Sequence, residues 1–334
     1  MSADVRTAAA TAAVRYAVPP IDDRAMAHWD QSASVATLSG ATMGTRWQVR
    51  YAEPENHDPA QLSAEIQGLF ATIIADMSHW VAESRLCVIN RSPPGEWHSV
   101  SADFADVLGT ALEVAAVSGG AFDPAIGALV DLWGYGPVAV DRAPMMQEIA
   151  AAREGGGWQQ LDLDRGACRV RRRGTARLDL SGIAKGHAVD RLSKLLQQNE
   201  IFHSLVEIGG EFVGRGLRPD GDPWWVELET PGACAAPIRV ALHQCAAATS
   251  GDYIRGRHTI DPRTGSPVAH ALAVSVIHET AMQADAWATA LSVVAPAEMM
   301  AMAAARHLRV RALIRREGRI VEWLSPELRA MIDD

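Results

Sequence analysis

The sequence predicts an α+β fold, built as a single large domain with mixed or antiparallel sheets and flanking helices. Segments with the two-residue alternation of strands and segments with the 3.6-residue spacing of helices are interspersed without a strict β–α–β rhythm. The 334 residues, 48% of them hydrophobic and 21% charged, suffice for a large core. Neither an internal repeat nor a linker divides the chain, so one domain is expected.

The two ends of the chain are expected to lie outside this domain. Residues 1–34 lack clear periodicity and contain Pro19-Pro20, so we expect a tail or a strap over the body. The domain is predicted to span residues 35–325, and residues 326–334 to form a C-terminal tail.

The first half of the chain predicts a pair of strands and two amphipathic helices. In order, the expected elements are strands in residues 35–51 around a turn at 40–44, a helix at 62–77, a turn-rich loop at 90–95, and a helix at 104–117 closed by Gly119-Gly120. The basic run Arg169–Arg173 lies between short apolar segments, and we expect it to be the exposed turn of a hairpin.

The second half predicts more strands, with three helices between them. The expected elements are strands at 178–180, 204–208, 211–213, 224–228, 238–242 and 273–277, helices at 185–198, 281–294 and 298–307, and a hairpin of strands 310–314 and 319–323. Pro296 is expected to open the third of these helices, because proline is favoured in a first helical turn.

Composition and missing motifs exclude several function classes. Acidic residues outnumber Lys and Arg by 40 to 31, which disfavours a dedicated nucleic-acid binder, since such proteins neutralise phosphates. The sequence also lacks GxGxxG, GxxxxGK[ST], GxSxG and HExxH, so a Rossmann dehydrogenase, a P-loop NTPase and an α/β-hydrolase are disfavoured.

The cysteines and the N-terminal residues favour the cytoplasm. The four cysteines form no CxxC pair and suit a reducing compartment better than a disulfide framework. The first 20 residues offer only a weak apolar stretch for a secretory signal, and no run of 18 apolar residues predicts a membrane-spanning helix.

One candidate site follows the strand predicted at residues 178–180. That strand delivers Asp179, Ser181 can cap the next helix, and the free N–H groups of the helix start suit a phosphate that Lys185 could also reach. The alternative is an ordinary capped turn with a surface lysine.

A second candidate site lies on the helix predicted at residues 281–294. Asp285 and Thr289 are four residues apart and share a helix face that is otherwise lined by alanine. A buried carboxylate needs a partner, and oxygen ligands of this kind suit Mg²⁺. The alternative is a structural Asp beside a Thr that bonds back to its own helix.

Two further segments carry groups with a chemical use. His258 precedes the turn predicted at Asp261-Pro262, with Gly265 at a positive φ, and could act as an acid or base. Trp133 and Tyr135 lie between glycines and could stack on a planar ring. A structural histidine and plain core packing are the respective alternatives.

Taken together, nine segments occur in an order that resembles the FAD:protein FMN transferases, the ApbE family. The segments are Gly40–Thr45, Met77–Ser92, Ala121–Pro124, Leu132–Pro137, Asp179–Gly186, Glu207–Glu211, Thr249–Tyr253, Ile260–Gly265 and Ala284–Thr289. The resemblance runs from about Val35 to about Trp323, over nearly the whole predicted domain.

The resemblance implies a Mg²⁺-dependent enzyme that binds FAD in a central cleft, transfers FMN to a threonine hydroxyl of a target flavoprotein and releases AMP. It implies that Asp285, Thr289 and the carbonyl of Gly182 hold the metal. By position, the residues that would contact the flavin nucleotide are Met43, Trp80, Ala121, Phe122, Asp123, Asp179, Lys185 and Ile260. The catalytic residues would be Asp285, Lys185 and His258, with His258 taking a proton from the acceptor threonine or orienting the phosphate.

The sequence departs from the family pattern at three places. Trp80 stands where tyrosine is common, position 185 varies in the family between Lys and Glu, and only Ile254–Arg257 separate Tyr253 from His258, where relatives carry a longer hairpin. Many relatives are exported lipoproteins, whereas this sequence predicts a cytoplasmic protein that modifies a soluble reductase or a cytoplasmic-facing domain.

Two alternatives stay open for the activity. An FAD pyrophosphatase would use the same residues but pass the FMN group to water. A non-catalytic protein would bind FAD and leave it intact.

Overall fold

The computed structural model describes residues 13–21, 23–55, 57–253 and 256–332. At its centre is an eight-stranded sheet with the strand order β16-β15-β14-β11-β8-β7-β3-β2, antiparallel throughout. Its strands are β2 (Val35–Thr42), β3 (Thr45–Ala52), β7 (Ser204–Ile208), β8 (Glu211–Arg215), β11 (Gln244–Gly251), β14 (Ala271–His278), β15 (Arg309–Arg316) and β16 (Arg319–Leu324). The predicted α+β class is confirmed.

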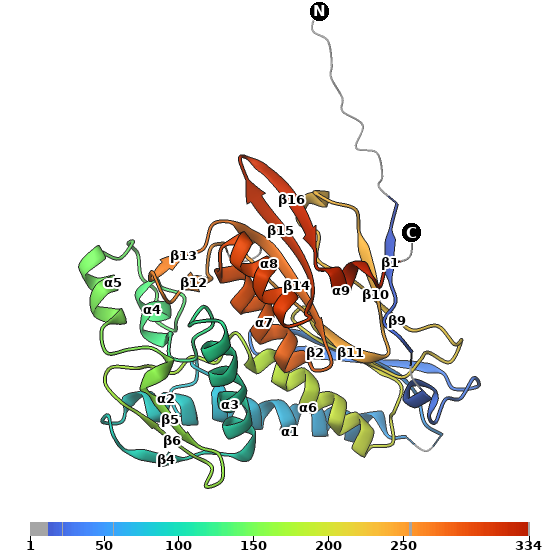
Figure 1. Cartoon of the computed structure of the whole chain (residues 1–334). Helices are drawn as coiled ribbons and strands as arrows, with labels where there is room; N and C mark the ends of the chain where they lie inside the picture. The colour runs from blue at the N-terminus through green and yellow to red at the C-terminus, as the bar shows by residue number, and fades with distance from the viewer. Residues whose placement is uncertain (1–12, 22, 56, 254–255, 333–334) are drawn as a thin grey trace, which may run out of the picture.

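Helices cover one face of this sheet (Figure 1). Helix α7 (Ala281–Val293) lies over β11 and β14, and α6 (Ala184–Gln198) lies over β7 and β8, in contact with α7. The other long helices are α1 (Pro59–Met77), against α6, α3 (Ala102–Val117), against α7, and α8 (Pro296–Ala305). Their apolar side chains and those of the sheet form the main core.

The opposite face of the sheet is covered by a smaller one. Strands β1 (Arg15–Ala17), β10 (Ile238–Leu242) and β9 (Trp224–Glu227) form it, with β1 parallel to β10, and α9 (Pro326–Arg329) packs beside it. Strand β7 shows why two layers form: Val206 faces the helices and its neighbour Leu205 faces the smaller sheet, as strand alternation requires.

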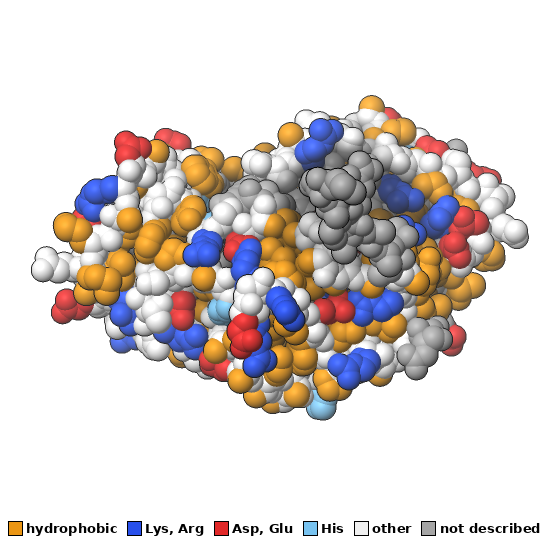
Figure 2. Space-filling view, turned by 90° about the horizontal axis from the view of Figure 1, so that it is seen from above, with side chains coloured by type: hydrophobic (Ala, Val, Ile, Leu, Met, Phe, Trp, Pro, Cys, Tyr) orange, Lys and Arg blue, Asp and Glu red, His pale blue; other side chains and the backbone are white. Residues whose placement is uncertain are grey.

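The remaining elements form a lobe at one end of the molecule, the left end in Figure 1. They are α2 (Arg85–Arg91), α4 (Gly127–Leu132), α5 (Met146–Arg153), the sheet β4 (Trp97–Ser99), β6 (Arg169–Arg172), β5 (Leu161–Asp164), and the pair β12 (Ile260–Asp261) and β13 (Ser266–Pro267). Leu129, Ile149 and Ile260 form a small core between α4, α5 and β12. On the upper face, acidic and basic side chains are mixed with hydrophobic ones (Figure 2).

Most long helices begin and end where capping chemistry predicts. Asp58 accepts hydrogen bonds from the N–H groups of Ala60 and Gln61 and starts α1 earlier than the apolar spacing alone indicates. Gly119 and Gly120 take positive φ after α3, and Pro296 opens α8, both as predicted.

The basic run Arg169–Arg173 was wrongly predicted as a hairpin turn. Residues 169–172 form strand β6, between β4 and β5. Arg172 is buried, and its guanidinium donates to the carbonyls of Ile89 and Ala176 at 2.9 and 2.7 Å and to that of Ser92. Those three acceptors compensate the burial of the charge. The prediction of an exposed turn was wrong because it considered only the charge of this segment.

The predicted strand 178–180 is also wrong as a regular element. Only one bridge forms there, between Arg177 and Ile126. The extended backbone is held instead by Asn90 of α2, whose side chain exchanges two hydrogen bonds with Leu178, at 2.9 and 2.7 Å. Asn90 therefore belongs to a helix that fixes the site, and not to the loop predicted at 90–95.

The two ends of the described chain meet at the smaller sheet. The N–H of Val18 donates to the carbonyl of Met331 at 2.8 Å, and Ala17 and Leu328 are fully buried. The division of the chain at residues 35 and 325 stays a prediction.

Within the described ranges, none of the helices combines the length and apolarity needed to cross a membrane. All four cysteines are free thiols.

Candidate active site

The site is built where the first turns of α6 and α7 meet. A Cβ at Gly186 would lie 2.3 Å from the carbonyl oxygen of Ala281, so only glycine allows this approach. The N–H of Gly186 donates to Oδ2 of Asp285 at 3.0 Å. The start of α6 is therefore attached directly to the acidic side chain of α7.

Thr289 is in contact with Gly182, and Asp285 lies one helical turn before Thr289 on α7. Asp285 is buried, with 6% of its surface exposed. A Cβ at Gly182 would lie 3.1 Å from Oγ1 of Thr289 and 3.2 Å from the ring of Phe122, so the Gly182 backbone lies against the hydroxyl. The Asp285 carboxylate, the Thr289 hydroxyl and the Gly182 backbone thus come from two segments that are in direct contact, α7 and the start of α6 with its preceding loop.

This arrangement fits a hard divalent cation such as Mg²⁺. The candidate ligand atoms are all oxygens, which Mg²⁺ prefers. Burial raises the pKa of Asp285 because it disfavours the charged carboxylate, and a bound cation would offset that unfavourable free energy. Any side chain at position 182 would fill the space between the Gly182 backbone and the Thr289 side chain. Within the part of the chain that is described, no three His, Cys, Asp or Glu side chains form a metal-holding group, so the fit depends on hydroxyl and backbone oxygens besides Asp285.

Lys185 and Glu211 form an ion pair beside Asp285. Lys185, in the first turn of α6, bonds Oε1 of Glu211, which starts β8. Burial raises the pKa of Glu211, as does the charge of Asp285, and the charge of Lys185 opposes the rise. The face around Asp285 is therefore charged as well as alanine-lined, and Lys185 is no plain surface residue.

Asp179 is placed by its own loop and not by a strand. The N–H and the hydroxyl of Ser181 donate to Oδ1 of Asp179 at 2.8 and 2.5 Å, so Ser181 does not cap α6 as predicted. Ile183 occupies the N-cap position without a side-chain bond. The N–H of Asp179 donates to the carbonyl of Pro124 at 2.9 Å, which joins this loop to the segment of Asp123.

Two side chains offer surfaces for a planar ring. Met43 and Gly44 form the two-residue turn between β2 and β3, both with positive φ, which is rare for a residue such as methionine. Trp80 is 60% exposed, and its ring lies 5.1 Å from that of His79. Nδ1 of His79 lies 3.9 Å from Oδ2 of Asp179, so Trp80 and Asp179 belong to one neighbourhood.

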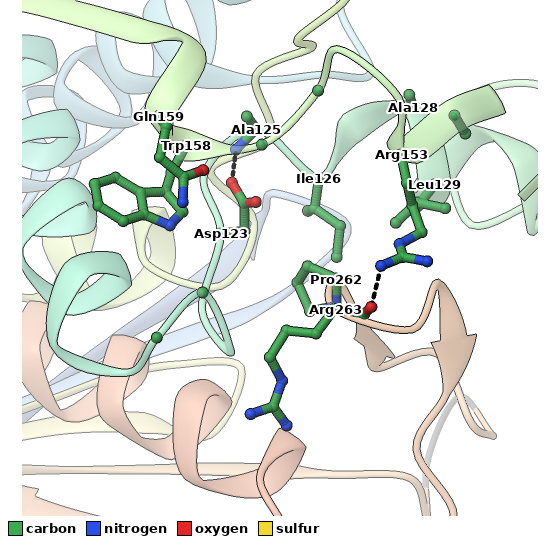
Figure 3. Close-up of a pocket in the computed structure, with 15 residues that line it drawn as sticks. Asp123, Ala125, Ile126, Ala128, Leu129, Arg153, Trp158, Gln159, Pro262 and Arg263 are labelled. Atoms are coloured by element: carbon green, nitrogen blue, oxygen red, sulfur yellow. Dashed lines mark hydrogen bonds between the residues drawn. The ribbon is translucent and has the colours of Figure 1, made fainter. Parts of the chain in front are cut away.

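Asp123 borders a cavity of about 280 Å³ (Figure 3). Its carboxylate accepts a hydrogen bond from the N–H of Ala125 at 2.7 Å, and burial raises its pKa to about 6. Trp158 and Pro262 line the same cavity, and Arg153 donates across it to the carbonyl of Arg263. The volume suits one ring system better than a whole dinucleotide.

His258 lies apart from the Asp285 group. Its Nδ1 lies 3.0 Å from the carbonyl of Gly256, and its ring lies 6.3 Å from that of Tyr135. The hydroxyl of Tyr135 donates to the carbonyl of Arg257 at 3.1 Å, which holds the His258 segment against α4. The positive φ predicted for Gly265 is confirmed, and Trp133 donates to its carbonyl at 2.8 Å. Trp133 and Tyr135 thus hold the loop around His258 and Gly265 in place by hydrogen bonds.

Direct contacts join the predicted site residues into separate groups. The first group is Gly182, which contacts both Phe122 and Thr289. The second group is Asp285 and Lys185, which both lie near Glu211. The third group is Asp179, whose backbone is hydrogen-bonded to the loop that carries Asp123. Ala121 is buried beside Phe122, Ile260 lies in the small core next to the cavity, and Met43 packs on the main core.

Sequence reasoning gave no role to Glu211, Asp190 or His79. Glu211 follows Gly209-Gly210, a pattern that signals a turn and says nothing of burial. Asp190 and His79 are single polar residues whose importance depends on contacts distant in sequence.

Comparison with known proteins places this geometry in a family. The model of the ApbE family matches residues 43–314. An FAD:protein FMN transferase of Klebsiella pneumoniae (strain 342) is 32% identical over 321 residues, which cover 90% of each chain. The solved flavin transferase ApbE of Vibrio cholerae superposes with a TM-score of 0.84 at 32% identity, covering 90% of this chain and 99% of its own. The flavinyl transferase ApbE of Pseudomonas stutzeri, in its apo form, gives 0.83 at 30% identity, covering 90% of this chain and 97% of its own. This chain belongs to the ApbE family.

Proposed function

We propose that this protein transfers the FMN part of FAD to a hydroxyl group of an acceptor protein and releases AMP. The observation that carries the proposal is the oxygen-lined space at Gly182, Asp285 and Thr289, placed beside the loop of Asp179. The relatives that cover nine-tenths of the chain are named FAD:protein FMN transferases, which supports the same reaction.

The reaction breaks the phosphoanhydride bond of FAD and forms a phosphoester bond to the acceptor hydroxyl. The hydroxyl oxygen of an acceptor threonine or serine attacks the phosphorus of the FMN half, and the bond from that phosphorus to the bridging oxygen breaks. AMP leaves with the bridging oxygen, and the hydroxyl proton passes to a base. Catalysis of this kind depends on positioning and on neutralising phosphate charge.

We propose Asp285, Thr289 and the carbonyl of Gly182 as the residues that hold Mg²⁺. When bound, Mg²⁺ would neutralise charge on the pyrophosphate of FAD. The net charge of −9 makes such a cation useful, because an acidic protein otherwise repels a pyrophosphate. Lys185 adds a positive charge at the start of α6, and Glu211 fixes the position of that charge.

We propose the remaining predicted residues as the binding surface for FAD. Trp80 stacks on a ring, while Met43, held in its strained turn, packs against the flavin from the sheet side. The other contacts come from Ala121, Phe122, Asp123, Asp179, Lys185 and Ile260. Asp123 faces the cavity of Figure 3, and its carboxylate could accept a hydrogen bond from a nucleotide ring.

His258 is the proposed base. Donation from Nδ1–H to the Gly256 carbonyl leaves Nε2 with a free lone pair, which is the form needed to accept a proton. Tyr135 keeps the segment in place, so His258 would meet the acceptor from the lobe side of the site.

The acceptor is proposed to be a flavoprotein with a threonine or serine flavinylation site. We keep the cytoplasm as the proposed compartment, for which the support is that all four cysteines are free thiols.

The proposal is tested by incubating the protein with FAD, Mg²⁺ and a candidate acceptor, then measuring AMP by chromatography and flavin fluorescence on the acceptor band. We expect AMP and bound flavin in equal amounts, and neither product in EDTA. AMP release that is unaffected by acceptor, with free FMN and no fluorescent band, would instead show an FAD pyrophosphatase. FAD left intact in excess Mg²⁺ would show a non-catalytic binding protein.

A further inference from the structure

Asp190, in the second turn of α6, accepts hydrogen bonds from the start of α7. Its Oδ1 takes the N–H of Ala281 at 2.9 Å, and its Oδ2 takes the N–H of Met282 at 2.9 Å. These are the first two N–H groups of α7, which the helix itself cannot satisfy. A carboxylate there also interacts favourably with the helix dipole.

The charge of Asp190 is otherwise costly at this place. Burial raises the pKa of Asp190 to about 6, and the two backbone N–H bonds and the nearby guanidinium of Arg215 oppose that rise. Arg215 is itself partly buried on β8, where burial lowers its pKa and Asp190 raises it. A partly buried carboxylate that is bonded in this way indicates a structural connection between α6 and α7.

The connection is reciprocal. Asp190 lies four residues after Gly186 in α6, and Asp285 lies four residues after Ala281 in α7. Side chains of a helix point back toward its N-terminus, so each carboxylate reaches the first turn of the other helix. Asp285 takes the N–H of Gly186, while Asp190 takes those of Ala281 and Met282.

This pair of contacts bears on the candidate metal ligands. Asp285 and Thr289 are carried by α7, whereas Gly182 is carried by the loop that leads into α6. Their relative placement therefore depends on how the two helix starts are joined. Asp285 supplies one of the two connections, through its Oδ2, and Asp190 supplies the other.

We propose that Asp190 is a positioning residue, which joins α7 to α6 so that Asp285 and Thr289 face the Gly182 carbonyl in the geometry that a divalent cation requires. The inference rests on the proposed function for its use of Mg²⁺. Residues that orient metal ligands without touching the metal commonly change metal affinity by about 10- to 100-fold when removed.

Thr280 provides a matched control on the same helix end. Its hydroxyl caps α7 by accepting from the N–H of Gln283 at 3.3 Å, and it makes no bond to α6. Thr280→Ala therefore weakens the start of α7 without breaking the connection between the helices.

The experiment measures Mg²⁺ binding by isothermal titration calorimetry in wild type, Asp190→Ala and Thr280→Ala, with the melting temperature of each. We expect Asp190→Ala to weaken Mg²⁺ binding by at least about tenfold and Thr280→Ala to change it by less than about twofold. FAD affinity without metal should stay within about twofold in both. If Asp190→Ala does not fold, Asp190→Asn, which keeps one acceptor oxygen, should show a smaller loss of Mg²⁺ affinity.

Unchanged Mg²⁺ affinity in the Asp190 variants would overturn the inference, and so would equal losses in Asp190→Ala and Thr280→Ala. The proposed function fails separately: a wild-type protein that binds Mg²⁺ but transfers no FMN would refute the activity, while the comparison of the variants would still decide the role of Asp190.

Discussion

Lys185 and Glu211 form an ion pair in which each charge compensates the burial of the other. Glu211 is 2% exposed, its Oε1 is bonded to Lys185, and its Oε2 has no hydrogen-bond partner among the described residues. Removing one member of such a pair costs more than replacing both by apolar groups, because a buried polar group is left behind.

Lys185→Met is therefore expected to lower the free energy of unfolding by about 2 kcal/mol. The double variant Lys185→Met/Glu211→Leu, which removes both charges, should recover most of that loss. Urea unfolding of wild type and both variants measures the difference. A single variant that is no less stable than the double would contradict this account of the pair.

The carboxyl of Asp123 gives the site a dependence on pH. Burial raises its pKa to about 6, from the usual 3.8 of an aspartic acid, against hydrogen bonds from the backbone of Ala125 and Trp158. Its folded pKa is higher than its unfolded pKa, so the protonated carboxyl favours the folded state. That contribution is complete below about pH 4 and is lost as the pH rises through about 6.

The stability of wild type relative to Asp123→Asn should therefore fall between about pH 4 and pH 7, by on the order of 2 to 3 kcal/mol, and stay level above that range. Other titrating groups cancel, since both proteins contain them. Thermal unfolding at intervals of half a pH unit tests this. A difference that is independent of pH would mean that Asp123 is not buried as the structure has it.

At the scale of elements, the contact between α6 and α7 is the one on which the site depends. Gly186 meets the backbone of Ala281 and Met282, whereas Gly68, in the middle of α1, has nothing within 4 Å of where a Cβ would be. The same substitution should thus have opposite effects in two helices.

We expect Gly186→Ala to destabilise the protein by more than about 2 kcal/mol, because a Cβ 2.3 Å from a carbonyl oxygen forces the helices apart. Gly68→Ala should stabilise it by up to about 1 kcal/mol, since alanine is the better helix former. Chemical unfolding of both variants decides. Equal effects would show that the two helices do not approach as closely as described.

Elements with strong local signals could be predicted, and elements defined by distant partners could not. The helices at 104–117 and 281–294 were found from apolar spacing and glycine or proline signals. Strand β6 was missed because three consecutive arginines indicate exposure, whereas Arg172 is compensated by carbonyls of Ile89, Ser92 and Ala176. No local pattern contains that information.

For the whole molecule, the two ends of the described part of the chain support the sheet from the face opposite the site. Leu328 is fully buried and Met331 is 8% exposed in the core between the sheets, together with Ala17 of β1. The candidate ligands lie on the helix side of the eight-stranded sheet (Figure 1). Changes to the core between the two sheets should therefore alter the stability of the protein without altering the chemistry of the candidate site.

A chain ended after Ser325 should lose about 2 to 4 kcal/mol of stability, because Leu328 and Met331 leave the core. Well below its melting temperature, it should transfer FMN at a kcat within about twofold of wild type. Calorimetry and the transfer assay test the two statements. A large loss of kcat in the folded, truncated chain would contradict the separation.

The candidate site could be predicted from the order of nine short segments, because ligands of one substrate must converge whatever their spacing. The contacts between segments could not be predicted, because Asp190, Glu211 and His79 contact partners up to a hundred residues away in the sequence. Ser181 was expected to cap α6 and instead bonds Asp179, since an Asx-type turn competes with the cap.

The central claim is that FAD is cleaved at the space bordered by Asp285, and Asp285→Asn tests it most directly. Asparagine keeps an oxygen for the N–H of Gly186 but removes the charge, so the fold should persist. With saturating FAD, acceptor and Mg²⁺, we predict that AMP release and acceptor flavinylation both fall by more than about 100-fold, while FAD still binds. Turnover at the wild-type rate would contradict the account.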